Sequence, residues 1–242
     1  MNENLDYKFI DNKSDKTIIF LHGWGLNKNS FLKIINGLSD NCNILYLDFF
    51  GFGNSPEPQY PYDTYEYAYQ IFMLICKLNL KKIYLVGHSF GGRISIILSS
   101  IFDIKIHCIL LTSSAGLNRF NIIKFIKIRW FKFIKKLVKL KLLHNNKLNG
   151  FGSNDYQQLS NKMKLIFIKI VNQDLSYLLS KIECKTLLVW DRKDAVTPIW
   201  ICNKMFRQIK HTQKYLFKNG GHFTFFYNTG KLINIVENMT FM

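Results

Sequence analysis

Short apolar runs alternate with longer amphipathic segments along most of the chain. Apolar runs bounded by polar residues or glycines predict strands, and apolar residues at three- and four-residue spacing predict helices. The predicted strands are residues 7–10, 17–21, 44–47, 82–86, 105–112, 186–190 and 214–217. The predicted helices are residues 29–38, 64–78, 93–100, 198–209 and 230–238, the first of them capped by Asn29 or Ser30.

This alternation predicts an α/β fold. Strands separated by helices form mostly parallel, doubly wound sheets whose right-handed crossovers place helices on both faces. One block departs from the alternation, because residues 116–181 have helical periodicity throughout. The chain also has no Asp or Glu between Asp103 and Asp155, which separates this block electrostatically. We therefore expect one α/β core that carries a helical insertion.

A serine lies at the turn between one predicted strand and the helix behind it. Residues 87–91 are Gly-His-Ser-Phe-Gly, directly after the apolar run 82–86. Gly87 and Gly91 allow a turn tight enough to lift the hydroxyl of Ser89 above the sheet. The helix that begins behind Ser89 also directs backbone N–H groups toward any negative charge formed there. The pattern is typical of a serine nucleophile, and an ordinary strand–helix turn is the alternative.

The Gly-x-Ser-x-Gly turn in this setting resembles the nucleophile elbow of the α/β-hydrolase family. The resemblance implies the α/β-hydrolase fold, with a core of residues 1–115 and 182–242 and a helical cap, or lid, of residues 116–181. It also implies a reduced antiparallel edge, since residues 7–10 leave little room for the usual first hairpin. A serine at the elbow argues against the dehalogenase and epoxide-hydrolase branches, which place an aspartate there.

A serine hydroxyl is a poor nucleophile and needs a neighbouring base that a carboxylate orients. In the family the order along the chain is Ser, then Asp or Glu, then His. His222 follows the last predicted strand in a glycine-rich loop, where the family places its base. His88 lies inside the elbow and His22 in the loop after a strand, so neither is expected to act as the base.

Two carboxylates compete for the role of the triad acid. Asp191 and Asp194 both follow the predicted strand 186–190 directly. The resemblance favours Asp194, which lies four residues before Pro198, while Asp191 occupies the place where the family commonly has a glycine. A third interpretation is a solvated charge cluster in which these carboxylates pair with Arg192 and Lys193.

Acyl transfer also needs hydrogen-bond donors for the oxyanion that forms in the transition state. The resemblance assigns this role to the backbone N–H of Phe90, after the nucleophile, and to that of Trp24, in the loop 22–25. His22 is expected to brace that loop. The loop 48–55 matches a family pattern and is expected to be structural.

Together these residues predict a serine hydrolase that cleaves an ester or related acyl substrate through an acyl-enzyme, with no cofactor and no metal. Loops 22–27 and 51–53 also resemble the esterases that cleave pimeloyl-carrier methyl esters. A carboxylesterase acting on an acyl-carrier-linked ester is therefore one alternative. A hydrolase-like ligand-binding or peripheral membrane protein with little turnover is another.

The formal net charge of +17 raises the question of an anionic partner. Nucleic acid is not expected, because the chain has no zinc-ligand spacing and no RNA-binding motif, and its 28 lysines far outnumber its 5 arginines. Residues 121–140 form a basic amphipathic segment. Its lysines are interpreted as a solvated face, or as a contact with an acidic carrier protein or an anionic membrane surface.

The five scattered cysteines form no Cys-x-x-Cys pair and predict reduced thiols. The N-terminus lacks the basic and apolar regions of a signal peptide, and no apolar stretch is long enough to span a bilayer. These observations predict a cytoplasmic protein.

Overall fold

The computed structural model describes residues 5–118 and 158–241. The basic segment 121–140, and with it most of the expected cap, lies outside the described residues. The boundaries of core and cap therefore stay predictions.

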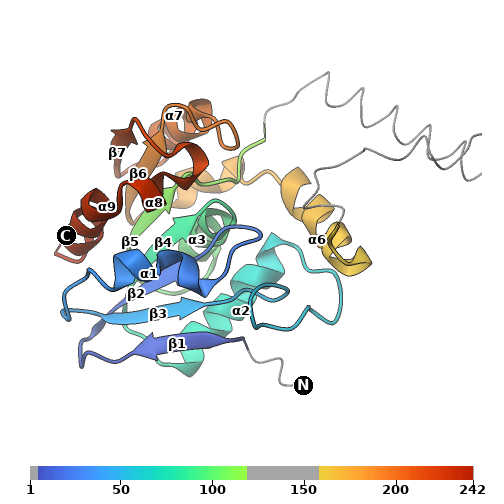
Figure 1. Cartoon of the computed structure of the whole chain (residues 1–242), viewed down its shortest axis with the longest axis horizontal. Coiled ribbons are helices and arrows are strands. Elements are labelled where there is room, and N and C mark those ends of the chain that lie inside the picture. The colour runs from blue at the N-terminus through green and yellow to red at the C-terminus, as the bar shows by residue number, and fades with distance from the viewer. Residues whose placement is uncertain (1–4, 119–157, 242) are drawn as a thin grey trace, which may run out of the picture.

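A seven-stranded sheet forms the centre of the molecule (Figure 1). Its strand order is β1-β3-β2-β4-β5-β6-β7, and every pair is parallel except the edge pair β1–β3. This confirms the mostly parallel sheet and its single antiparallel edge strand. The strands are β1 (Tyr7–Ile10), β2 (Lys16–Leu21), β3 (Asn43–Leu47), β4 (Lys82–His88), β5 (Ile106–Thr112), β6 (Lys185–Asp191) and β7 (Thr212–Phe217).

Helices cover both faces of this sheet, as expected for a doubly wound fold. Apolar residues of α2, α3 and α7 pack on one face, and those of α1, α8 and α9 pack on the other. The helices are α1 (Leu32–Ile35), α2 (Thr64–Lys77), α3 (Phe90–Ile101), α6 (Asn161–Asn172), α7 (Ile199–Gln208), α8 (Thr224–Tyr227) and α9 (Thr229–Met239), with short 3-10 turns η1 (Lys28–Phe31), η3 (Ser176–Lys181) and η4 (Gly221–Phe223). Within the described ranges, none of these helices could cross a membrane.

The helix expected over residues 29–38 is wrong in its bounds and its cap. The chain forms η1 and then the single turn of α1, and the capping residue is Asn27. The Asn27 side chain accepts a hydrogen bond from the N–H of Asn29, and the hydroxyl of Ser30 accepts one from the N–H of Asn27. The start lies earlier because Asp48 holds both ends of Lys28, accepting bonds from its backbone N–H (2.6 Å) and its Nζ (2.9 Å).

Candidate active site

Ser89 joins the carboxyl end of β4 to α3, in a backbone conformation that few L-residues adopt. Its φ is 49° and its ψ is −103°. Glycines make the turn possible, because a Cβ at Gly91 would lie 2.0 Å from the carbonyl oxygen of Leu21. A Cβ at Gly87 would likewise lie 2.5 Å from Oγ of Ser95. The close approach of α3 to β2 and β4 therefore imposes the strained turn, at a cost of about 1–3 kcal/mol.

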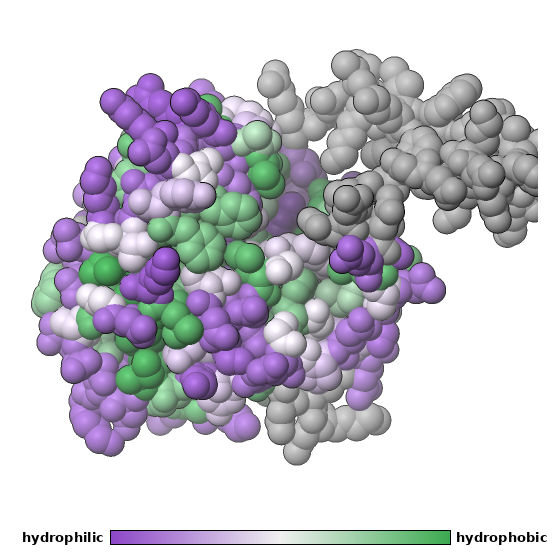
Figure 2. All heavy atoms as spheres, in the orientation of Figure 1, coloured by the Kyte–Doolittle hydropathy of each residue, from purple (hydrophilic) through white to green (hydrophobic). Residues whose placement is uncertain are grey.

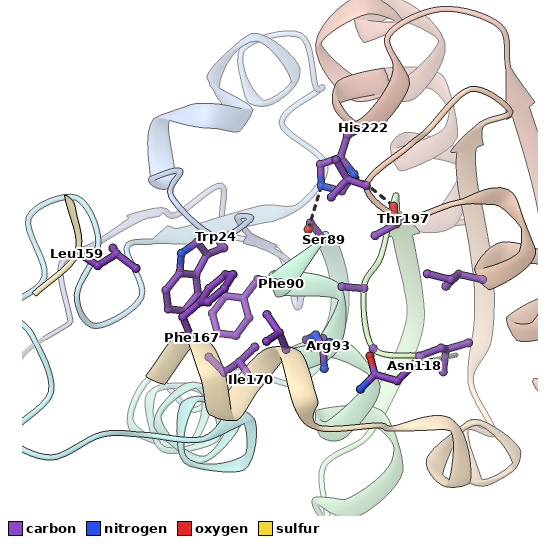
Figure 3. A pocket seen from close by; sticks show the side chains of 16 residues that line it. Trp24, Ser89, Phe90, Arg93, Asn118, Leu159, Phe167, Ile170, Thr197 and His222 are labelled. Carbon is purple, nitrogen blue, oxygen red and sulfur yellow. Dashed lines mark hydrogen bonds between the residues drawn. The ribbon is translucent and has the colours of Figure 1, made fainter. Parts of the chain in front are cut away.

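His222 reaches over Ser89 from the loop that follows β7. Its Nε2 lies 3.0 Å from Oγ of Ser89 (Figure 3). Its Nδ1 lies 3.0 Å from Oδ2 of Asp194. Gly220 and Gly221 precede it with φ values of 109° and 53°. These left-handed conformations, which glycine adopts without a steric penalty, turn the chain back toward the elbow.

Asp194 is held as a buried carboxylate by the loop between β6 and α7. One of its oxygens accepts the backbone N–H groups of Val196 (2.9 Å) and Thr197 (2.8 Å). Burial raises the pKa of Asp194, but the hydrogen bonds from His222 and Thr197 outweigh it and leave the pKa below its ordinary value. The group is thus an anion placed to hold a proton on Nδ1 of His222.

Asp191 is also buried but makes different contacts. It accepts hydrogen bonds from the backbone N–H of Lys193 (2.7 Å) and of Gly221 (2.9 Å). Asp191 thus braces the loop that carries His222, while Asp194 contacts the imidazole. In the part of the chain that the structure describes, neither carboxylate is ion-paired with Arg192 or Lys193, so a solvated charge cluster is not what forms here.

Thr197 joins this group, although the sequence analysis did not single it out. Its hydroxyl lies 2.7 Å from Oδ2 of Asp194, 3.0 Å from the carbonyl oxygen of Ser113 and 3.2 Å from Nδ1 of His222. Its single hydroxyl proton can serve one acceptor at a time. Its position three residues after Asp194 was the available signal, because Ser and Thr near an Asp often close such local turns.

His22 and His88 are buried beside the site and are uncharged. His22 accepts the backbone N–H of Phe49 on Nε2 (3.1 Å), so its Nδ1 donates to the carbonyl of Gly23 (2.7 Å). His22 therefore braces the loop after β2, as expected. Burial lowers the pKa of His22 to about 4 and that of His88 to about 3, so neither histidine is charged at neutral pH.

A cavity of about 580 Å³ opens in front of Ser89 (Figure 3). Most of its lining is apolar, and Trp24 packs edge-on against Phe90 (5.7 Å between centroids) and Phe167 (5.3 Å). No hydrogen bond in the described part of the chain engages the backbone N–H of Trp24 or of Phe90. The lining residues are Trp24, Ser89, Phe90, Arg93, Ala115, Gly116, Leu117, Asn118, Leu159, Phe167, Ile170, Val171, Val196, Thr197, Ile201 and His222.

η4 and α8, next to His222, carry exposed aromatic side chains. Phe223, Phe226 and Tyr227 are exposed, and Figure 2 shows apolar atoms over this part of the surface.

Across the two described ranges, no cluster of His, Cys, Asp and Glu could hold a metal ion.

Comparison with known proteins finds hydrolases among those that are similar to this chain. A family model described as "alpha/beta hydrolase fold" matches residues 16–139. The uncharacterized hydrolase YugF of Bacillus subtilis is 28% identical, over 90% of this chain and 88% of its own. A pimeloyl-[acyl-carrier protein] methyl ester esterase of Neisseria meningitidis is 24% identical, over 87% of this chain and 88% of its own. The solved esterase of Exiguobacterium antarcticum is 23% identical, with a TM-score of 0.76 over 98% of this chain and 95% of its own.

Proposed function

The chain belongs to the α/β-hydrolase fold family, and we propose that it is a serine hydrolase that cleaves an ester or related acyl substrate. One observation carries the proposal: the hydrogen-bonded series from Asp194 through His222 to Ser89 ends at the cavity. Nucleophile, base and orienting carboxylate in hydrogen-bond reach of one another are the arrangement that acyl transfer requires.

In this proposal Ser89 is the nucleophile. Its Oγ attacks the substrate carbonyl carbon while Nε2 of His222 takes the hydroxyl proton, and the carbonyl electron pair moves onto the oxygen. The tetrahedral intermediate collapses to an acyl-enzyme as His222 returns that proton to the leaving alcohol. Water then attacks the ester of Ser89 by the same route and releases the acid. Asp194 keeps Nδ1 of His222 protonated and stabilises the imidazolium that forms.

The backbone N–H groups of Trp24 and Phe90 are proposed to stabilise the oxyanion. Phe90 is the first residue of α3, so its N–H has no partner within the helix. Trp24 follows β2 and lines the same cavity. Two fixed donors at such a site supply a large share of the rate enhancement in acyl transfer.

A fluorophosphonate probe tests the proposal directly. It should add one label to the wild-type protein and none to Ser89→Ala, while Ser113→Ala, which changes a nearby buried serine, should still be labelled. An activity screen across acyl chain lengths and leaving groups should then find an ester that wild type cleaves and Ser89→Ala does not. A wild-type protein that binds acyl ligands saturably without turnover would support the alternative of a ligand-binding protein.

A more specific candidate is hydrolysis of an ester carried by an acyl-carrier protein. The Neisseria relative is named for that activity, and residues 124–141 of this chain hold eight Lys and Arg residues. Acidic carriers and basic surfaces attract one another electrostatically. Carrier-linked substrate should then be cleaved faster than the free methyl ester of the same acid, and the difference should shrink at high salt.

A further inference from the structure

Arg93 is a buried cation in the wall of the cavity. It lies on α3 four residues after Ser89, which corresponds to a rise of about 6 Å along the helix axis. Only 5% of the residue is exposed. Its side chain is one of those that line the same cavity as Ser89 (Figure 3).

The described residues offer the buried charge of Arg93 little compensation. One terminal nitrogen donates to the carbonyl oxygen of Gln173 (2.8 Å), and Arg93 forms no ion pair within residues 5–118 and 158–241. Asp174, whose charge acts on Arg93, accepts bonds from the Asn118 N–H (2.9 Å) and the Ser176 hydroxyl. Burial lowers the pKa of Arg93 to about 10, so the guanidinium stays charged at neutral pH. Arginines this buried are normally paired.

No acidic side chain lines the described part of the cavity. Among the described lining residues, Arg93 and His222 are the ionisable ones, and none is acidic. The amide of Asn118 also lines the cavity. A guanidinium has five N–H donors in a planar fork, so one bond to Gln173 leaves donors to bind an anion in bidentate fashion.

We propose that Arg93 binds a carboxylate on the acyl part of the substrate, so that monoesters of short dicarboxylic acids are preferred over neutral esters. The inference rests on the proposed serine hydrolase. The substrate's charge replaces the missing counter-ion, and the scissile carbonyl then lies near Ser89, about one helical turn away. A structural role for Arg93, limited to tethering α3 to Gln173, predicts no preference between charged and neutral esters.

The test compares matched p-nitrophenyl esters of equal chain length: mono-glutarate with valerate, and mono-adipate with hexanoate. Rates are corrected for spontaneous hydrolysis, which the neighbouring carboxylate accelerates. Wild type should show a higher kcat/KM for at least one charged ester. Hydrogen bonds to charged groups contribute about 1.5–3 kcal/mol, so Arg93→Met should lower that kcat/KM by about 10- to 150-fold. It should change the rates for the neutral esters by less than about threefold.

Two further variants separate charge from packing. Arg93→Lys keeps the charge without the fork and should retain part of the preference. Arg207→Met removes an exposed arginine of α7 and should leave the preference unchanged. Equal losses on charged and neutral esters in Arg93→Met, or a wild type without preference, would overturn the proposal.

Binding measurements keep the inference separate from the proposed chemistry. Glutarate or adipate should bind to the inactive Ser89→Ala protein in titration calorimetry and should not bind when Arg93→Met is added. This result would support Arg93 as an anion receptor even if no ester were cleaved. Absence of dicarboxylate binding to Ser89→Ala would contradict it, whatever the esterase activity.

Discussion

Nε2 of His88 lies 3.0 Å from the backbone carbonyl oxygen of His222. A carbonyl only accepts, so Nε2 carries the proton, and the buried Nδ1 of His88 has no partner among the residues that the structure describes. The residue before the proposed nucleophile thus holds the main chain of the proposed base. The contact is from the ring of His88 to the main chain of His222, and it fixes the distance between the end of β4 and the loop after β7.

Loss of this bond should impair turnover more than substrate binding. His88→Ala frees the backbone of His222, and misplacement of a catalytic group by about 1 Å can cost about a hundredfold in rate. We expect kcat to fall about 10- to 100-fold with KM little changed. His211→Ala, which removes an exposed histidine before β7, is the control and should leave both constants unchanged. A change confined to KM would argue against a positioning role.

Substitution of Asp191 and of Asp194 should have very different effects on kcat. Asp194→Asn leaves Nδ1 of His222 without its anionic partner and should lower kcat by about 10⁴-fold with the fold retained. Asp191→Asn should have a much smaller effect, because its carboxylate bonds to Gly221 N–H and not to the ring. The combined loss in Asp194→Asn with His222→Ala should be far from additive, since both act in one proton transfer. The reverse order of the two Asn variants would reassign the acid to Asp191.

Stability should decrease on mild acidification because of the buried histidines. The pKa of His22 is lowered to about 4 and that of His88 to about 3, while an unfolded histidine titrates near 6.5. Below pH 6.5 the unfolded chain therefore binds protons that the folded chain excludes. This contribution is complete above pH 6.5 and falls by about 1.4 kcal/mol per pH unit per histidine between about pH 6 and pH 4. Urea denaturation across this range measures the slope, and His22→Gln should reduce it by about half.

Lys28 should be important for stability, because unlike most lysines it is buried. Its side chain is 7% exposed, and its Nζ contacts Asp6 and lies 2.9 Å from Asp48, which is buried. Lys28→Met leaves the carboxylate of Asp48 uncompensated and should lower the free energy of unfolding by about 3–5 kcal/mol. The control is Lys13→Met, whose pair with Asp11 is exposed and should contribute little. Urea denaturation distinguishes the two, and similar small effects would show that water screens Lys28.

The eight Lys and Arg residues within residues 124–141 should affect only charged, bulky substrates. Replacing Lys132, Lys135, Lys136 and Lys139 by Gln should leave hydrolysis of a small neutral ester nearly unchanged. Activity on carrier-linked or vesicle-bound ester should fall in the same variant, and more at low than at high salt, because the Debye length is about 8 Å at physiological ionic strength. Equal rates on both substrates at all salt concentrations would identify a solvated surface without a partner.

The sequence predicted the five inner strands because burial on both faces leaves continuous apolar runs, and it predicted most helices from the spacing of their apolar residues. It failed at residues 27–31, where the deciding interaction is a long-range one between Lys28 and Asp48. Local propensity contains no information about that pair.

Local sequence patterns also predicted part of the candidate site. Ser89 and His222 lie in glycine-marked loops at strand ends, which a pattern reveals. Asp191 and Asp194 share that pattern, and only the direction in which the loop folds brings one to the imidazole. From the sequence, Arg93 resembles an ordinary polar residue on a helix. Its burial depends on packing against α6 and the chain around Gln173, which the local pattern does not reveal.

The backbone conformation of Ser89 bears on why a serine is kept at this position. A glycine would occupy φ 49° without the steric penalty that serine incurs. In this chain, loss of the nucleophile by Ser89→Gly would therefore relieve strain, although glycine adds flexibility to the unfolded chain. The backbone conformation at this position therefore favours glycine over serine. The persistence of serine in a descendant lineage would report selection for the reaction itself.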